Sequence, residues 1–290
     1  WHGRTLGAQL MSGNESQKEW IGFRDNDIHH IAFPYPWELV DISPEEFLIK
    51  ELKKLSDKGI SLENDICGFM LETFQGWGAI FYPKNFVKSI SNLCKKNNIL
   101  LAFDEMQAGF GRTGESFGFQ HYEVLPDLIA CGKGMGGGVP LSGVLGKAEI
   151  MDLPDIGNMS STHSANPLVC SAGLAVLEEL EKGNLVKEAK EKGKYLKELL
   201  MNLKTKYYKN VIYVFGEGLI AAIIFKSTKN GISDNNFTSK VAEKCYQKGL
   251  LVVHTGRESI KIGPPLVITK EALKEGVDVL DEAIDEVLAE

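Results

Sequence analysis

Hydrophobic and polar positions between residues 43 and 131 alternate between helix-like and strand-like patterns. Apolar residues spaced three and four apart predict helices at 43–55 and 83–96. Each helix is followed by an apolar run of strand length, and such runs occur at 66–71, 99–103 and 127–131. Strands that are apolar on both faces and alternate with helices are typical of a mostly parallel sheet covered by helices. The pattern therefore predicts an α/β fold.

The first of these helices has clear start signals in the segment SPEEFLIKELKKL. Ser43 and Glu46 have the spacing of a capping box, and Pro44 occupies the first helical position. The apolar face is formed by Leu48, Leu52 and Leu55. These signals predict that the helix begins directly after Ser43.

The C-terminal part of the chain repeats the α/β pattern on a smaller scale. After a strongly helical and charged stretch from about 166 to 206, strands are predicted at 211–215, 219–225 and 250–254, with a helix near 238–248. The last helix carries an apolar stripe of Leu273, Val277, Leu280, Ile284 and Val287. We expect a large domain at 1–175, a helical connection at 176–206 and a small C-terminal domain at 207–290.

Composition and charge narrow the classes of partner. The 290 residues are 43% hydrophobic, with a formal net charge of −7 and a pI of about 5.5. A general binder of nucleic acid or of an anionic membrane needs a basic face. No apolar run reaches the length needed to span a membrane. We therefore expect small-molecule partners, with neither nucleic acid nor a membrane.

The cysteines and histidines do not form a metal or disulfide pattern. The five cysteines lie far apart and include no CxxC pair: Cys67, Cys94, Cys131, Cys170 and Cys245. The histidine pair at 29–30 has no partner at metal-ligand spacing, so no metal site is predicted. The first ten residues lack a signal-peptide pattern, and we expect a reducing, cytoplasmic compartment. The chain begins at Trp1 in sequence typical of mid-domain, so we expect an N-terminal part outside it.

Charged residues follow three of the predicted strands. Glu72, Asp104 and Lys133 come at or just after the ends of these strands, where ligands of parallel sheets gather. A lysine flanked by glycines, with its pKa lowered by nearby burial, can act as a nucleophile and form a Schiff base. A carboxylate on a neighbouring strand end can keep a pyridine-type ring nitrogen protonated. Asp104 and Lys133 are therefore the candidate catalytic pair.

Other interpretations of these two residues stay open at this point. A strand-end aspartate is often a helix cap or a turn former, and a lysine among glycines is often only exposed. A P-loop is not indicated, because the GKG pattern at 132–134 lacks the preceding spaced glycine and a following Ser or Thr. A Rossmann fingerprint is not indicated either, because the glycines lack a strand-to-helix context.

Several blocks, taken in order, resemble the class III pyridoxal-phosphate aminotransferases, the family of ornithine, acetylornithine and 4-aminobutyrate aminotransferases. The blocks are WHGRTLGA at 1–8, LETFQGWG at 71–78, LAFDEMQAGFGRTGESFGFQ at 101–120, PDLIACGKGMGGGVPLSGVLG at 126–146, SSTHSANPL at 160–168 and IKIGPPLVIT at 260–269. The resemblance implies the fold type I large domain, a smaller C-terminal α/β domain, and a homodimer whose active sites lie at the subunit interface. It also implies a transaminase that uses pyridoxal 5'-phosphate.

The same resemblance implies roles for individual residues. Lys133 would form the Schiff base and shuttle a proton, and Asp104 would pair with the pyridinium nitrogen. Gln107 would approach the phenolic oxygen of the cofactor, and Trp1 would stack on its ring. Thr162 would reach the cofactor phosphate of the other subunit.

Two residues depart from the family pattern. Where ornithine- and 4-aminobutyrate-type members carry a second glutamate, this chain has Trp77, and where they carry an arginine before PPL, it has Lys261. A lysine lacks the two-pronged geometry with which arginine grips a carboxylate. We therefore expect an ω-amine or an amino sugar as the amino donor. The arginines left to hold a keto acid are Arg4, Arg24, Arg112 and Arg257.

The resemblance leaves two alternatives to an aminotransferase. Class III relatives include racemases, aminomutases and a decarboxylase, which use the same cofactor for other reactions. The glycine-rich loop that binds the cofactor phosphate in this family lies upstream of the HGRT block and is not in this sequence. A non-catalytic fragment that lacks part of the cofactor site is the second alternative.

Overall fold

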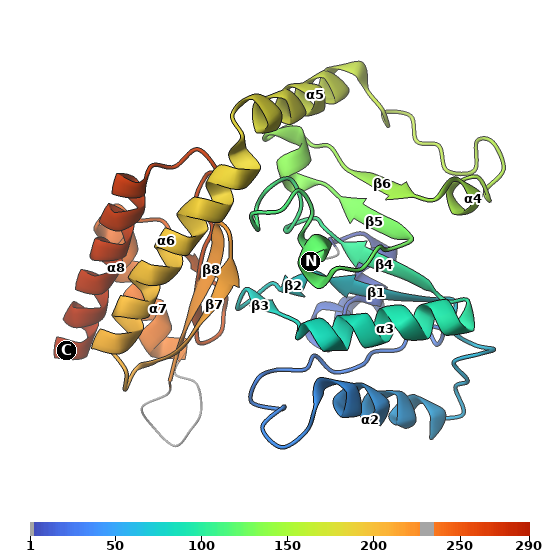
Figure 1. Ribbon diagram of the computed structural model, residues 1–290, viewed down its shortest axis with the longest axis horizontal. Helices are drawn as coiled ribbons and strands as arrows, with labels where there is room; N and C mark the ends of the chain where they lie inside the picture. Colours follow the sequence, from blue (N-terminus) through green and yellow to red (C-terminus); the bar gives the residue numbers. More distant parts are fainter. Residues whose placement is uncertain (1–2, 227–234) are drawn as a thin grey trace. The chain divides into compact units, whose positions relative to one another are not determined.

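The computed structural model describes residues 3–226 and 235–290 and has an α/β architecture. Two compact units interleave along the chain (Figure 1). Unit 1 comprises Trp1–Thr73, Tyr82–Gln107 and Phe119–Val169, and unit 2 comprises Phe74–Phe81, Ala108–Gly118 and Cys170–Glu290. Because two short segments of the N-terminal half belong to unit 2, the units are not simple halves of the sequence. The linear division at residues 175 and 206 stays a prediction.

Unit 1 is built on a four-stranded sheet with the order β1-β4-β5-β6. Its strands are β1 (Gly68–Glu72), β4 (Leu100–Asp104), β5 (Leu128–Cys131) and β6 (Gly143–Gly146). The first three are parallel, as the apolar runs predicted, and β6 runs antiparallel to β5. Glu72 pairs with Asp104 in the register, and Asp104 pairs with Ala130. The charged strand ends therefore meet at one edge of the sheet.

One amphipathic helix packs on this sheet, and a second packs on that helix. The helix α3 (Lys84–Asn97) contacts β4, and α2 (Pro44–Ser56) packs against α3 (Figure 1). The predicted capping box is confirmed, because the Ser43 hydroxyl accepts the Glu46 N–H and the Glu46 carboxylate accepts the Ser43 N–H. The buried positions of α3 are Phe86, Val87, Ile90, Ser91 and Cys94.

The remaining elements of unit 1 are short. They are α1 (Leu6–Met11), η1 (Glu15–Gln17), η2 (Glu19–Ile21), η3 (Gly118–Tyr122, whose first residue belongs to unit 2), η4 (Lys133–Gly136) and α4 (Ala148–Met151). Of these, η4 bears on the candidate site because it begins at Lys133.

Unit 2 contains an antiparallel sheet with the order β7-β8-β10-β9 and a separate hairpin. The sheet strands are β7 (Val211–Glu217), β8 (Ile220–Phe225), β9 (Val253–His254) and β10 (Ser259–Ile262), and the hairpin is β2 (Phe74–Gln75) with β3 (Ile80–Phe81). The predicted strand at 250–254 shortens to two residues. At this edge Leu251 is 81% exposed, and β9 pairs with β10 only through Val253 and His254.

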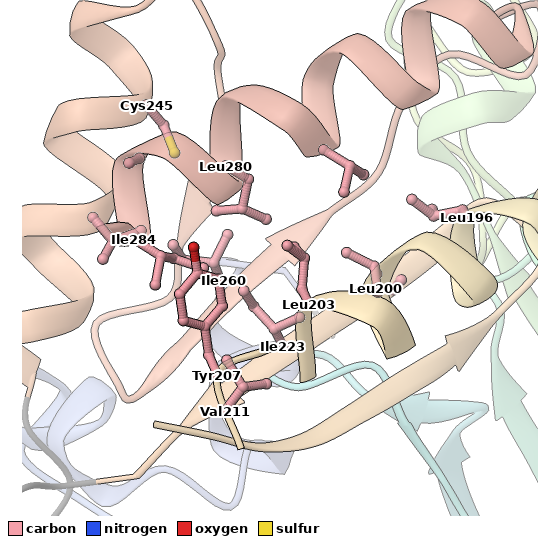
Figure 2. Packing of buried hydrophobic residues seen from close by; sticks show 14 of the residues in the cluster. Leu196, Leu200, Leu203, Tyr207, Val211, Ile223, Cys245, Ile260, Leu280 and Ile284 are labelled. Atoms are coloured by element: carbon pink, nitrogen blue, oxygen red, sulfur yellow. The ribbon is translucent and has the colours of Figure 1, made fainter. Parts of the chain in front are cut away.

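Helices pack on the sheet of unit 2 and supply most of its core. They are α6 (Leu185–Lys206), α7 (Asn235–Gln247) and α8 (Lys270–Ala289), whereas α5 (Pro167–Lys182) begins in unit 1 and continues into unit 2. Figure 2 shows leucines of α6 directed toward strand and α8 side chains such as Ile223 and Leu280. The predicted apolar stripe of α8 is confirmed, since all five of its residues are buried. Within the described ranges, no helix is long and apolar enough to cross a membrane.

Candidate functional site

The carboxylate of Asp104 lies at the end of β4, in the middle of the parallel part of the unit 1 sheet. Its side chain is buried, with 3% exposure, although a carboxylate is costly to remove from water. One oxygen, Oδ1, accepts the backbone N–H of Met106 at 2.9 Å. This short local contact fixes the orientation of the carboxylate at the turn that leaves the strand.

Lys133 follows the neighbouring strand β5 and begins the turn η4. Its backbone has φ 45°, in the left-handed region that costs a residue with a side chain about 1 to 2 kcal/mol. The Met135 N–H donates to the Gly132 carbonyl at 3.0 Å, which closes the turn around Lys133. Strained backbone of this kind persists where the surrounding structure enforces it, and it is concentrated at functional sites.

Gly132 brings the ends of β4 and β5 close together. A Cβ at this position would lie 2.7 Å from Met106 Sδ and 3.3 Å from Ser142 Cβ. A side chain here would displace the Met106 thioether and press on Ser142. Close packing therefore favours a glycine directly before Lys133.

The two charged groups act on each other electrostatically. Desolvation by the surrounding protein lowers the pKa of the Lys133 ammonium, although part of the side chain is exposed. The carboxylates of Asp104 and Glu72 act in the opposite direction and raise that pKa, but the net direction is downward. The strand ends thus bring together the three charged residues that the sequence placed there. The net lowering of its pKa by desolvation favours a Lys133 that is neutral, and hence nucleophilic, at lower pH than an exposed lysine.

The other predicted cofactor residues are less closely grouped. Gln107 is half-buried, three residues beyond Asp104. Thr162 is exposed in the turn at 162–165, where the Ser164 hydroxyl donates to the Ser161 carbonyl at 2.7 Å. Trp1 lies outside the described residues.

Trp77 and Lys261, the two departures from the family pattern, lie together within unit 2. Lys261 Nζ donates to the Gly76 carbonyl at 2.9 Å, and the Ser259 hydroxyl donates to the Trp77 carbonyl at 2.8 Å. These two bonds hold the backbone of the β2–β3 hairpin against β10. One of the three ammonium protons of Lys261 is therefore committed to the protein itself.

Arg257 is one of the four arginines that the sequence analysis named as candidates to hold a keto acid. The structure distinguishes it from the other three. Its guanidinium carbon lies 3.8 Å from the centroid of the Trp77 ring, a close cation–π contact. The side chain is 47% exposed and its Nη2 lies 3.3 Å from Glu258 Oε1. The guanidinium thus contacts the Trp77 ring and donates to Glu258 while almost half of the side chain stays exposed. No pattern in the sequence connects residues 77 and 257.

Glu105 is a second residue that the sequence reasoning missed. It is fully buried beside Asp104, and its carboxylate accepts the Phe119 N–H at 2.7 Å and the Thr73 hydroxyl. A charged residue directly after an apolar strand is usually solvated, so no sequence signal predicts this burial. Only the fold brings its partners to it.

The residues at the unit 1 strand ends fit a pyridine cofactor that carries an aldehyde. Such a group needs a buried carboxylate for its ring nitrogen and an amine for its aldehyde carbon, and Asp104 and Lys133 supply both from adjacent strands. Among residues 3–226 and 235–290, no three His, Cys, Asp or Glu side chains are grouped so that they could hold a metal ion.

Comparison with known proteins agrees with this geometry. The family model for class III aminotransferases matches residues 1–284. An acetylornithine aminotransferase of Caldanaerobacter subterraneus subsp. tengcongensis is 31% identical, with 99% of this chain and 66% of the relative covered. A leucine/methionine racemase of Thermococcus litoralis is 34% identical with the same coverage.

The comparison with solved structures also finds transaminases. A transaminase from directed evolution by ancestral reconstruction superposes with a TM-score of 0.89 at 28% identity, covering 100% of this chain and 66% of that protein. The chain thus spans just under two thirds of the length of these similar proteins.

Proposed function

This chain belongs to the class III aminotransferases, and from that membership we propose that it moves an amino group between a primary amine and a keto acid. Both the family and its α/β fold, fold type I of the pyridoxal-phosphate-dependent transferases, agree with the sequence predictions. The observation that carries the proposal is the pairing of Asp104 and Lys133 at the ends of adjacent parallel strands. Pyridoxal 5'-phosphate is the cofactor of this family.

Asp104 and Lys133 have complementary tasks in this proposal. When bound, pyridoxal phosphate supplies a ring that accepts the electron pair released at the substrate carbon. The buried carboxylate of Asp104 holds a proton on the ring nitrogen, which keeps the ring electron-poor. Lys133, with its lowered pKa, holds the cofactor through Nζ and then carries the proton to and from the substrate carbon.

Three further residues complete the proposed cofactor site. Gln107 leaves the same strand end as Asp104 and is assigned to the phenolic oxygen of the cofactor. Thr162 is exposed, as a residue must be to reach the phosphate bound by another subunit. Trp1 is assigned to the face of the ring. The role of Thr162 makes a homodimer part of the proposal, and a cytoplasmic location remains part of it as well.

The contacts in unit 2 support a proposal for the substrates. Lys261 is tied to the Gly76 carbonyl, so it is a poor substitute for the arginine that grips an α-carboxylate in ornithine-type relatives. Trp77 offers a flat apolar surface in place of a glutamate. We therefore assign ω-amines or amino sugars as the donors. We assign the exposed guanidinium of Arg257 to the carboxylate of the keto acid.

Amino-acid racemisation is the second candidate function. It is favoured by the 34% identity with a leucine/methionine racemase and by 33% identity with an alanine/serine racemase of Pyrococcus horikoshii. Racemisation needs a proton to be removed and returned on opposite faces of the substrate carbon, and it needs no keto acid. The same Asp104 and Lys133 would serve it.

One experiment distinguishes the aminotransferase from the racemase. The cofactor-loaded enzyme is incubated with amines and keto acids, and separately with single enantiomers of amino acids. We expect a new amino acid formed from the keto acid, in an amount equal to the amine consumed. Inversion of an enantiomer without any transfer of nitrogen to the keto acid would reject the aminotransferase and support the racemase.

A further inference from the structure

A buried hydrogen-bond network in unit 1 ties together the places where the chain leaves this unit and returns. The chain passes between units 1 and 2 after Thr73, before Tyr82, after Gln107 and before Phe119, and again within α5. The first four places meet in what we call the Glu105 network, which consists of Thr73, Tyr82, Glu105, Phe119 and Tyr122.

The carboxylate of Glu105 is the centre of this network. Its Oε1 accepts the Thr73 hydroxyl at 2.5 Å and the Phe119 backbone N–H at 2.7 Å. Glu105 is 0% exposed, and Thr73 and Phe119 are 1% and 8% exposed. The backbone N–H of Glu105 also donates to the Ala130 carbonyl at 2.8 Å, which connects the network to β5. Residues 32 and 14 positions away are thus held by one oxygen atom.

The phenol of Tyr122 forms the other half of the network. It donates to the Thr73 carbonyl and accepts the Tyr82 N–H at 3.1 Å. Its ring packs against Phe103 of β4, with centroids 6.2 Å apart. Tyr122 therefore joins both ends of the segment 74–81, while Glu105 joins both ends of the segment 108–118.

These two segments and their ends carry residues of the proposed site. Trp77 lies in the segment 74–81, and Gln107 is the last residue before the segment 108–118. Asp104 directly precedes Glu105, and the β5 strand end that leads to Lys133 accepts the Glu105 N–H through Ala130. A shift of Glu105 would therefore move the supports of Asp104, Gln107 and Lys133 together.

Stability alone does not account for a carboxylate in this place. Burying an ionised carboxylate is costly, and apolar replacements of buried charged groups are often neutral or stabilising. A carboxylate oxygen does, however, accept two donors at fixed directions, which apolar packing cannot do. We propose that Glu105 is a positioning residue, which holds the loop ends so that Asp104 and Gln107 meet the cofactor in a fixed geometry. The catalytic part of this proposal rests on the proposed function.

The test removes one donor while preserving shape. In Thr73→Val the network loses the Thr73 hydroxyl, and Thr73→Ser restores it. The matched control is Thr238→Val, another fully buried threonine to valine change, but in α7 of unit 2. If Thr73→Val does not fold, Tyr122→Phe breaks the same network at the phenol and is measured in its place.

Hydrogen exchange and kinetics are measured on the cofactor-loaded enzyme. We expect the Phe119 amide to exchange roughly tenfold faster or more in Thr73→Val, because its acceptor is no longer held. We expect kcat to fall about 10- to 100-fold with little change in KM for the amine, together with an altered absorption spectrum of the bound cofactor. Thr73→Ser should restore all three, and the control should change none of them.

Three outcomes of these measurements would contradict part of this account. Unchanged exchange at Phe119 in a folded Thr73→Val enzyme would refute the network. Faster exchange with unchanged kcat and cofactor spectrum would show that Glu105 is structural only and overturn the proposal. A parent enzyme that transfers no amino group would refute the proposed function instead, while exchange and the cofactor spectrum would still decide the role of Glu105.

Discussion

The strand-end site of unit 1, formed by Asp104 and Lys133, and the Trp77 cluster of unit 2, formed by Trp77, Arg257 and Lys261, present their charges in opposite ways. In unit 1, Asp104 is buried and oriented by Met106, and it acts on a lysine whose pKa is lowered. In unit 2, Arg257 is 47% exposed and lies on an aromatic ring. A buried, fixed charge suits a chemical step that is the same for every substrate. An exposed cation on a flat surface suits the selection of substrates.

From this contrast we propose that unit 1 carries the reaction and unit 2 the choice of substrate. Changes at the strand ends should abolish turnover with every donor. Changes at Trp77, Arg257 or Lys261 should alter the relative rates of different substrates. This assignment would be contradicted if changes at the strand ends altered only the relative rates of substrates. It would also be contradicted if changes at Trp77, Arg257 or Lys261 abolished turnover with every donor.

The largest effect is expected from Lys133→Ala. The change removes both the amine that holds the cofactor and the group that moves the proton, so turnover should fall by about 10⁴-fold or more with every donor. The measurement is kcat for a panel of amines. Lys147→Ala is the control, because Lys147 is an exposed lysine paired with Asp127, and it should retain nearly full activity.

Asp104→Asn should lower kcat by about 10²- to 10³-fold while the protein stays folded. The amide oxygen can still accept the Met106 N–H, but an amide cannot stabilise a protonated ring nitrogen as a carboxylate does. Thermal unfolding and kcat are measured together. Asp127→Asn removes a carboxylate at the start of β5 that accepts the Leu101 N–H, and it should affect stability only. Near-normal turnover of Asp104→Asn with bound cofactor would make Asp104 a structural turn residue.

Arg257→Gln should reduce kcat/KM for the keto acid by about 10- to 100-fold, with a much smaller effect on the amine half-reaction. The guanidinium is the group we assign to the acceptor carboxylate. Arg24→Gln serves as a matched control, because Arg24 is 41% exposed and also lies beside a glutamate. Equal losses for donor and acceptor in Arg257→Gln would contradict a role in substrate choice.

The double change Trp77→Glu with Lys261→Arg should shift preference by about tenfold toward ornithine- or 4-aminobutyrate-like donors. It restores the carboxylate and the two-pronged cation at the two positions where this chain departs from those relatives. The quantity compared is kcat/KM across a panel of amines, for the parent and the double variant. A parent that already prefers ornithine or 4-aminobutyrate to every ω-amine and amino sugar would refute our assignment of the donors.

The smallest expected effect is a shift in pH dependence. Lys133 reacts with the cofactor in its neutral form, so the rate at which cofactor-free enzyme takes up pyridoxal phosphate should rise with pH through a pKa below 10.5. The carboxylate of Asp104 raises that pKa, and Asp104→Asn should therefore move the rise to lower pH. Stopped-flow absorbance over a pH series measures this. A shift to higher pH in the variant would mean that Asp104 does not act on Lys133 as described.

The sequence predicted much of unit 1 because its signals are local. The apolar runs that end at Asp104 and Cys131, together with the rule for parallel strands, were sufficient to place Asp104 and Lys133 at one sheet edge. The antiparallel direction of β6 carried no such signal. The apolar run at 250–254 overstated an edge strand, in which Leu251 and Val253 are exposed.

What the sequence could not predict depends on residues far apart in the chain. The burial of Glu105 requires Thr73 and Phe119, and the stacking of Arg257 requires Trp77, 180 positions away. The left-handed backbone of Lys133 is equally hidden, because a lysine carries no preference for that conformation. Such contacts follow from the packed fold and have no counterpart in periodicity or spacing.

The most direct test of the strand-end site is chemical labelling of the lysine that holds the cofactor. The complete, cofactor-loaded enzyme is reduced with borohydride, digested, and the peptide that carries the reduced pyridoxal group is sequenced by mass spectrometry. We predict a single label on Lys133, in the peptide that follows β5. A label on Lys147 or on any other lysine, with Lys133 unmodified, would contradict the assignment of the reaction to this site.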